Sequence, residues 1–150
     1  MLLGWRRRLP GRWLYLGCLL PDLIDKPLFY VLGPTALLSG TRTFGHTGLF
    51  LIAWALLALM LRRPWCIALA AGIATHFALD IVSEMLTSAD PDSAIWLAIF
   101  YPAYGRFPQA KFASLLEHLE ISARNVVVVA GEVVGGALLI YGRLKRKTAL

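Results

Sequence analysis

The sequence predicts an all-α integral membrane protein, a helical bundle of about four transmembrane or partly re-entrant helices that forms one domain over residues 1–150. Of the 150 residues, 58% are hydrophobic and only 16% are charged, a more apolar composition than that of ordinary soluble domains. Long runs without charge approach the length of a membrane crossing. The basic residues gather at the ends of these runs, as they do beside transmembrane helices.

Two adjacent segments make the clearest crossings. Residues 44–61 carry no formal charge, and residues 65–86 are interrupted by only three ionisable side chains. At 1.5 Å per residue the two segments reach about 27 Å and about 33 Å, close to the hydrocarbon thickness of a bilayer. Arg62, Arg63 and Pro64 predict a turn between them, with the proline starting the second helix.

The remaining segments are less regular. Residues 12–21 lead into a stretch with three prolines and two aspartates, which predicts a short or broken helix followed by an interfacial or re-entrant segment. Residues 94–104 are aromatic but too short to span, as is typical of an interfacial segment. Residues 112–121 have the spacing of an amphipathic surface helix, and residues 125–141 form a further apolar run.

The basic clusters predict the orientation, because lysine and arginine near helix ends stay on the cytoplasmic side. If both termini and the Arg62–Arg63 turn are cytoplasmic, the chain crosses outward near 9–22, inward at 44–61, outward at 65–86 and inward at 121–142. The N-terminal run imitates a signal peptide but lacks a small-x-small cleavage site, so we expect it to be retained. The same clusters explain the net charge of +6 without a nucleic-acid partner.

This topology places ionisable residues of three distant segments at one level of the bilayer. Asp22 and Asp25 fall at the outer end of the first crossing, His46 at the outer start of the second, and His76 and Asp80 in the outer half of the third. A histidine and an aspartate four residues apart share one helix face, although such a pair can also serve only packing and helix ends. Carboxylates persist in apolar surroundings most easily beside a cation. The set suits a divalent metal, Zn²⁺ first and Mn²⁺ or Fe²⁺ as alternatives.

Four charged side chains near these residues are candidates for catalysis. Asp80 and Glu84 are the candidate general bases. Arg42 and Lys26 either bind the anionic part of a substrate or anchor the chain at the interface.

The last apolar run holds one acidic residue, Glu132, beside a GxxxG pair formed by Gly131 and Gly135. Such glycines predict close helix packing, with a homodimer through the same face as the weaker alternative. A glutamate in this setting is expected to hydrogen-bond within the helix contact.

Several short motifs, in this order, resemble a family of membrane-bound metal-dependent hydrolases that includes the LexA-binding, inner-membrane-associated hydrolases. The resemblance covers residues 17–108. It implies an all-α, multi-pass inner-membrane protein of a bacterium or archaeon with metal-dependent hydrolase activity, and it makes the three aspartates and two histidines above the metal ligands. The matching pieces are Leu19-Leu20-Pro21-Asp22, Asp25-Lys26-Pro27, Arg42, Gly45-His46-Thr47, His76, Asp80, Tyr101-Pro102 and Arg106-Phe107-Pro108.

The sequence therefore predicts a hydrolase in contact with the lipid bilayer, acting on a phosphoester or another ester, with a lipid or other amphiphile as the expected substrate. A bound metal would lower the pKa of a water molecule and polarise the scissile group. The competing hypotheses are a small membrane transporter and a scaffold whose metal only ties helices together.

Overall fold

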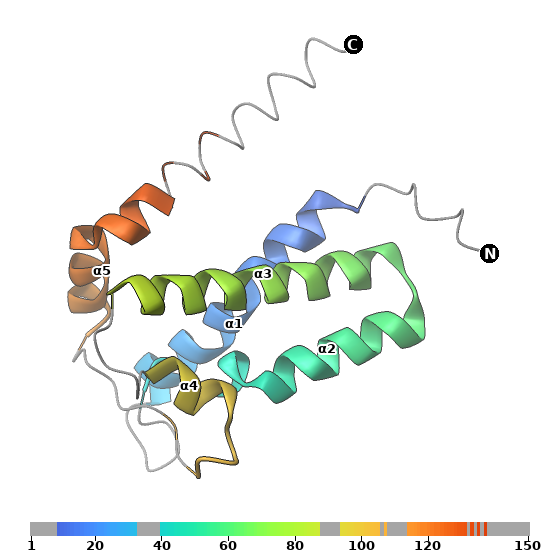
Figure 1. The fold of residues 1–150 in the computed structure, drawn as a ribbon, viewed down its shortest axis with the longest axis horizontal. Coiled ribbons are helices and arrows are strands. Elements are labelled where there is room, and N and C mark those ends of the chain that lie inside the picture. The colour runs from blue at the N-terminus through green and yellow to red at the C-terminus, as the bar shows by residue number, and fades with distance from the viewer. Residues whose placement is uncertain are drawn as a thin grey trace. The chain divides into compact units, whose positions relative to one another are not determined.

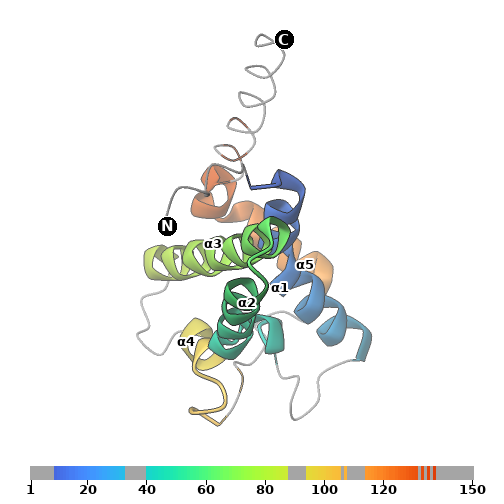
Figure 2. The same cartoon turned by 90° about the vertical axis from the view of Figure 1, so that its right-hand side faces the viewer.

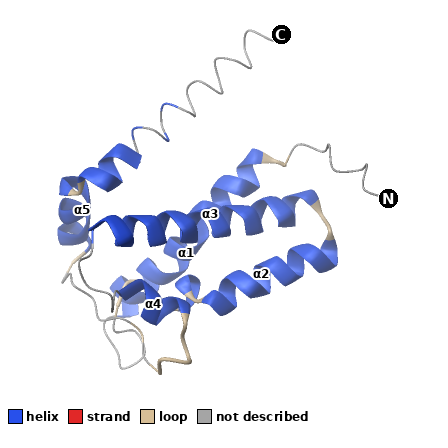
Figure 3. Cartoon of the chain, viewed as in Figure 1, coloured by secondary structure: helices blue, strands red, loops and turns tan. Residues whose placement is uncertain are grey.

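The computed structural model describes residues 9–32, 40–87, 94–105, 107, 114–131, 133, 135 and 137, and every regular element among them is helical (Figures 1 and 3). The predicted all-α class is thus confirmed for these residues. The chain divides into two compact units, Met1–Lys111 and Phe112–Leu150. The first contains α1 (Gly11–Leu32), the 3-10 turn η1 (Phe44–His46), α2 (Gly48–Leu61), α3 (Pro64–Thr87) and α4 (Ala94–Ile99), and the second contains α5 (Leu115–Arg124).

Helices α2 and α3 form a hairpin and lie side by side (Figures 1 and 2). Arg62 closes α2 in the left-handed conformation with φ 50°, and its N–H donates to the Ala58 carbonyl at 2.9 Å. Pro64 then begins α3, where its missing N–H leaves no hydrogen bond unmade. The turn and the helix start predicted from these residues are confirmed.

Helix α2 begins later than the predicted crossing at residues 44–61. Thr47 caps it, because the Thr47 Oγ1 accepts a hydrogen bond from the Phe50 N–H at 3.1 Å. Residues 44–46 therefore form the separate turn η1 in front of the helix. This break frees His46 from the helical pattern and lets its ring face the neighbouring helices.

Helix α1 is longer than predicted. The short or broken helix expected at residues 12–21 is wrong, since α1 continues through Pro21 and Pro27 to Leu32. Neither proline can donate to the carbonyl four residues earlier. The packing of α1 along α3 and against η1 supplies the stabilisation that these hydrogen bonds do not, and Pro21 itself is buried in that contact.

Two glycines set the distance between α1 and α3. A Cβ on Gly72 would lie 2.2 Å from the Leu14 carbonyl oxygen, 2.8 Å from the Cys18 nitrogen and 2.9 Å from the Gly17 Cα. The two backbones are therefore in direct contact at this crossing. Asp22 lies five residues after Gly17 on α1, and His76 lies four residues after Gly72 on α3. The crossing therefore also fixes the backbone positions of Asp22 and His76 relative to each other.

The first unit leaves much apolar surface uncovered. Along α2 the large side chains Leu49, Ile52, Leu56, Leu59 and Met60 are exposed, and Met60 is 80% exposed. Helix α2 is apolar all round, as membrane helices are. Among the described residues, one helix, Pro64–Leu86, is both long and apolar enough to cross a membrane, and α2 has 14 residues. The predicted crossing at 65–86 thus has a matching helix.

In the second unit the expected amphipathic helix is shifted along the chain. It runs from Leu115 to Arg124 instead of over residues 112–121, because the Ser114 Oγ accepts from the Glu117 N–H at 3.2 Å and starts it. Asn125 interrupts the helix and caps a new one through a hydrogen bond from the Val127 N–H at 3.0 Å. The final apolar run therefore begins as a separate helix at residue 126 and not at 121. Glu132 lies outside the described residues.

Candidate metal centre

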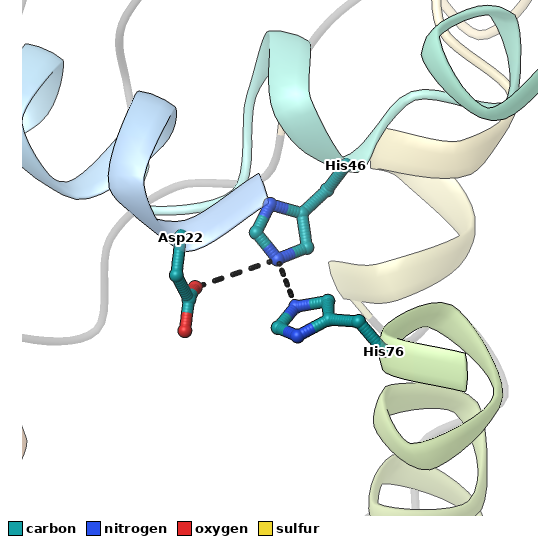
Figure 4. A group of neighbouring side chains, drawn as sticks. All are labelled: Asp22, His46 and His76. Atoms are coloured by element: carbon teal, nitrogen blue, oxygen red, sulfur yellow. Dashed lines mark hydrogen bonds and ion pairs between the residues drawn. The ribbon is translucent and has the colours of Figure 1, made fainter. Parts of the chain in front are cut away.

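Three segments far apart in the sequence bring Asp22, His46 and His76 together (Figure 4). Asp22 comes from α1, His46 from η1 and His76 from α3. The two imidazole Nε2 atoms lie 3.1 Å apart, and Asp22 Oδ1 lies 3.6 Å from the His46 Nε2. One ligand atom of each residue lies within 4.8 Å of the others, so all three can reach one ion.

Asp80 approaches the same point from the turn of α3 that follows His76. Its Oδ2 lies 3.5 Å from the His46 Nε2 and 3.9 Å from the His76 Nε2. In a tetrahedral zinc site with bonds of 2.0 to 2.1 Å, neighbouring ligand atoms are about 3.3 Å apart. The three distances from the His46 Nε2 to its neighbours, 3.1 to 3.6 Å, are close to that value, so the residues around His46 fit a zinc-sized cation.

The structure does not bring Asp25 into this group. The Asp25 carboxylate is completely buried and lies on the opposite edge of the His46 ring, where its Oδ2 is 2.7 Å from Nδ1. The same oxygen accepts the Thr43 N–H at 2.6 Å, and Oδ1 accepts the Gly45 N–H at 2.8 Å. Of the five predicted ligands, Asp22, His46 and His76 can share one ion, and Asp80 lies beside the two histidines. Asp25 lies on the opposite edge of the His46 ring.

Asp22 and His76 also have partners outside the group. Lys26 contacts the Asp22 Oδ2 at 2.7 Å and leaves Oδ1 toward the histidines. His76 is hydrogen-bonded to the backbone of Cys18. Metal-binding side chains commonly have such outer partners, which fix their orientation.

Arg42 connects the cluster formed by Asp22, His46, His76 and Asp80 to the next turn of α3. Its Nε lies 3.3 Å from the Asp80 Oδ2, and its Nη1 lies 2.9 Å from the Glu84 Oε2. The guanidinium therefore bridges two carboxylates that are one helical turn apart. Arg42, Asp80 and Glu84, three of the four predicted catalytic side chains, form one ion-paired group beside the histidines.

The cluster is dry on one side and open on the other. The His46 side chain is 3% exposed, and the Phe77 ring stacks on it at 6.2 Å between centroids. The side chains of Asp22 and Asp80 are 31% and 22% exposed. An ion or a small polar group can thus reach the carboxylates, whereas His46 is held in packed surroundings.

The YdjM inner membrane protein family matches residues 5–102, about two thirds of the chain and the whole of the cluster. The chain belongs to the YdjM inner membrane protein family. It is therefore an inner-membrane protein, as predicted. The comparisons with curated proteins and with solved structures gave no match. The YdjM description names a location and no chemistry, so the chemistry must be argued from the side chains.

The sequence did not reveal which backbone groups support the centre of this YdjM-family protein. The amides of Thr43 and Gly45 and the backbone of Cys18 carry no side-chain signal. One hint was available in Gly45, a small residue beside His46. A Cβ at Gly45 would lie 2.6 Å from the Pro21 carbonyl oxygen, so only glycine lets η1 approach α1 this closely.

Proposed function

We propose that this inner-membrane protein is a metal-dependent hydrolase in which Asp22, His46, His76 and Asp80 hold a divalent cation. The observation that carries the proposal is that the His76 Nε2, an Asp22 oxygen and an Asp80 oxygen all lie 3.1 to 3.6 Å from the His46 Nε2. Bare acceptor atoms this close repel one another, and a cation bound among them would remove this repulsion. Two nitrogen and two oxygen ligands favour Zn²⁺, with Mn²⁺ or Fe²⁺ as alternatives.

The ionisable groups around the cluster suit hydrolysis of an ester or phosphoester. A bound divalent cation would supply an activated water and polarise the scissile oxygen. Glu84 and Asp80 are placed to accept a proton, and both touch Arg42. Arg42, and Lys26 beside Asp22, carry the positive charge that stabilises a developing anion.

Exposed apolar side chains beside the cluster support a lipid or other amphiphile as the substrate. Leu19 and Leu23, on either side of Asp22, are 57% and 55% exposed, and Leu79 next to Asp80 is 64% exposed. A polar head group could therefore meet the carboxylates while its hydrocarbon chain stays against the helices and the bilayer.

The membrane arrangement belongs to the same proposal. The chain crosses four times, with both termini in the cytoplasm and the cluster in the outer half of the bilayer. A second copy of the chain could pack through Gly131 and Gly135, where an added Cβ meets nothing within 4 Å among the described residues. Glu132 lies between these glycines in the sequence, and we assign it to packing and not to chemistry.

Metal analysis of the detergent-purified full-length protein tests the proposal. We expect close to one Zn²⁺ per chain in the wild type and a loss of metal in His76→Ala and Asp22→Asn. His118→Ala and Glu120→Gln are the matched controls, because His118 is the third histidine of the chain and Glu120 pairs with Arg124 at an exposed site. These two variants should keep their metal.

Activity separates the hydrolase from the two other hypotheses. On a panel of phosphoesters, lipids and carboxylic esters, His76→Ala and Asp80→Ala should lose all hydrolysis, whereas Glu132→Gln should retain it. A wild type that holds its metal but cleaves nothing on the panel would favour the transporter or the scaffold. A wild type without metal would remove the proposal.

A further inference from the structure

We infer that Asp25 is a positioning residue that fixes the tautomer of His46, so that the Nε2 lone pair points at the cation. This inference rests on the proposed metal centre. It also gives Asp25 a different role from the ligand role that the sequence predicts.

The hydrogen bonds of Asp25 hold its carboxylate in place behind His46. Oδ2 accepts from the Thr43 N–H and from the His46 Nδ1, at 2.6 Å and 2.7 Å, and Oδ1 accepts from the Gly45 N–H at 2.8 Å. The side chain is completely buried and reaches no solvent. Three hydrogen bonds therefore hold this buried carboxylate, and moving it toward a cation would leave two buried amides without acceptors.

The same hydrogen bonds determine which nitrogen of His46 carries the proton. A carboxylate oxygen accepts and does not donate, so the 2.7 Å contact places the proton on Nδ1. A neutral imidazole has one proton, and its Nε2 is then a bare lone pair. That atom faces Asp22, His76 and Asp80 at 3.1 to 3.6 Å, where a cation requires a lone pair.

The backbone amides make this arrangement rigid. They come from the residues on either side of Phe44, so the turn that carries His46 is fastened to α1 at the same carboxylate. Gly45 allows the approach, because a Cβ there would lie 2.6 Å from the Pro21 oxygen and 3.2 Å from Asp25 Oδ1. One buried side chain thus sets the position, the tilt and the tautomer of His46.

The test uses the full-length protein in detergent micelles, with ¹⁵N-labelled histidines and Co²⁺ as the probe. Long-range ¹H–¹⁵N spectra of the metal-free wild type should show His46 with a protonated Nδ1 and a bare Nε2. Asp25→Asn keeps the shape but replaces one accepting oxygen with an NH₂ donor. We expect this variant to shift His46 toward the other tautomer and to raise the dissociation constant for Co²⁺ by about 10- to 100-fold.

Thr47→Ala is the matched control. It removes the cap of α2 beside His46, a hydrogen bond of 3.1 Å to the Phe50 N–H, but leaves the contacts of Asp25 in place. It should lower the thermal stability of the protein while His46 keeps its wild-type tautomer and the Co²⁺ affinity stays unchanged. This control thereby distinguishes a general loss of stability near His46 from the specific loss of the Asp25 carboxylate.

Three results would overturn the inference. One is a metal-free wild type with the proton on His46 Nε2, which decides the question even if Asp25→Asn does not fold. Another is unchanged Co²⁺ affinity in Asp25→Asn, and the third is a change in its Co²⁺ absorption bands that signals a lost ligand. A wild type that binds no Co²⁺ would refute the metal centre instead, and the His46 spectrum would still decide the role of Asp25.

Discussion

Arg42 offsets the negative charge of two carboxylates on α3, those of Asp80 and Glu84. It contacts Asp80 at 3.3 Å and Glu84 at 2.9 Å, and all three side chains are less than one third exposed. Like charges one helical turn apart repel, more strongly when they are partly buried. Arg42 offsets this repulsion, and a cation bound at the Asp80 oxygen would offset it as well.

Removing Arg42 should therefore destabilise the metal-free protein more than the metal-loaded protein. We expect Arg42→Gln to lower the free energy of unfolding by about 1 to 3 kcal/mol without metal, and by clearly less with saturating Zn²⁺, because the cation then neutralises Asp80. Thermal unfolding with and without Zn²⁺ measures the difference. Arg124→Gln is the control, since its pair with Glu120 is exposed and contributes little. Equal losses in both conditions would show that Asp80 does not bind the ion.

At the scale of single residues, the sequence predicts which residues lie at the site better than it predicts what each of them does there. The spacing of His76 and Asp80 places both on one helix face, and they do approach the same point in the structure. The role of Asp25 could not be predicted in this way. It depends on two backbone amides 18 and 20 residues further along the chain, and a turn between helices has no periodic pattern that would place them.

The relative position of α1 and α3, which both carry residues of the metal centre, depends on one close helix crossing. Gly17 on α1 and Gly72 on α3 touch backbone to backbone, as small residues allow in membrane helix pairs. The sequence did not predict this crossing because the two glycines are far apart in the chain. The prolines of α1 misled the prediction for a related reason: they weaken an isolated helix, but packing against α3 and η1 maintains it.

Gly72→Ala should therefore separate α1 from α3. Its Cβ would lie 2.2 Å from the Leu14 carbonyl oxygen, which is backbone and cannot move aside alone. We expect a loss of about 1 to 3 kcal/mol in the free energy of unfolding and a loss of metal binding, because Asp22 and His76 move apart. Gly11→Ala is the matched control: a Cβ there would lie 3.7 Å from the Tyr15 ring, an ordinary van der Waals contact. Thermal unfolding measures the stability of each variant, and metal analysis measures its metal content. Metal binding that survives in Gly72→Ala would show that the metal centre does not depend on this crossing.

In the first compact unit, aromatic and basic residues lie at the N-terminal ends of α1 and α3, and the cluster lies further along these helices. The tilted rings of Trp13 and Trp65 contact each other with centroids 5.4 Å apart, and the Arg12 guanidinium lies 5.8 Å from the Trp13 ring centre. Tryptophan and arginine favour the membrane interface. His76 follows Trp65 by 11 residues on the same helix, a rise of about 16 Å. In the proposed membrane arrangement, this distance would put the cluster at or beyond the middle of a bilayer about 30 Å thick.

This arrangement predicts that the tryptophan end faces the cytoplasm, because Arg62 and Arg63 lie beside it and positive charge is retained inside. The test places single cysteines in a background without Cys18 and Cys66, and labels intact cells with a maleimide that does not cross membranes. Arg63→Cys and Thr148→Cys should react only after the cells are permeabilised. Ser88→Cys, just beyond the other end of α3, should react in intact cells. Efficient labelling of both cytoplasmic positions from outside would invert the topology and move the metal cluster to the inner half of the bilayer, where substrate would arrive from the inner leaflet.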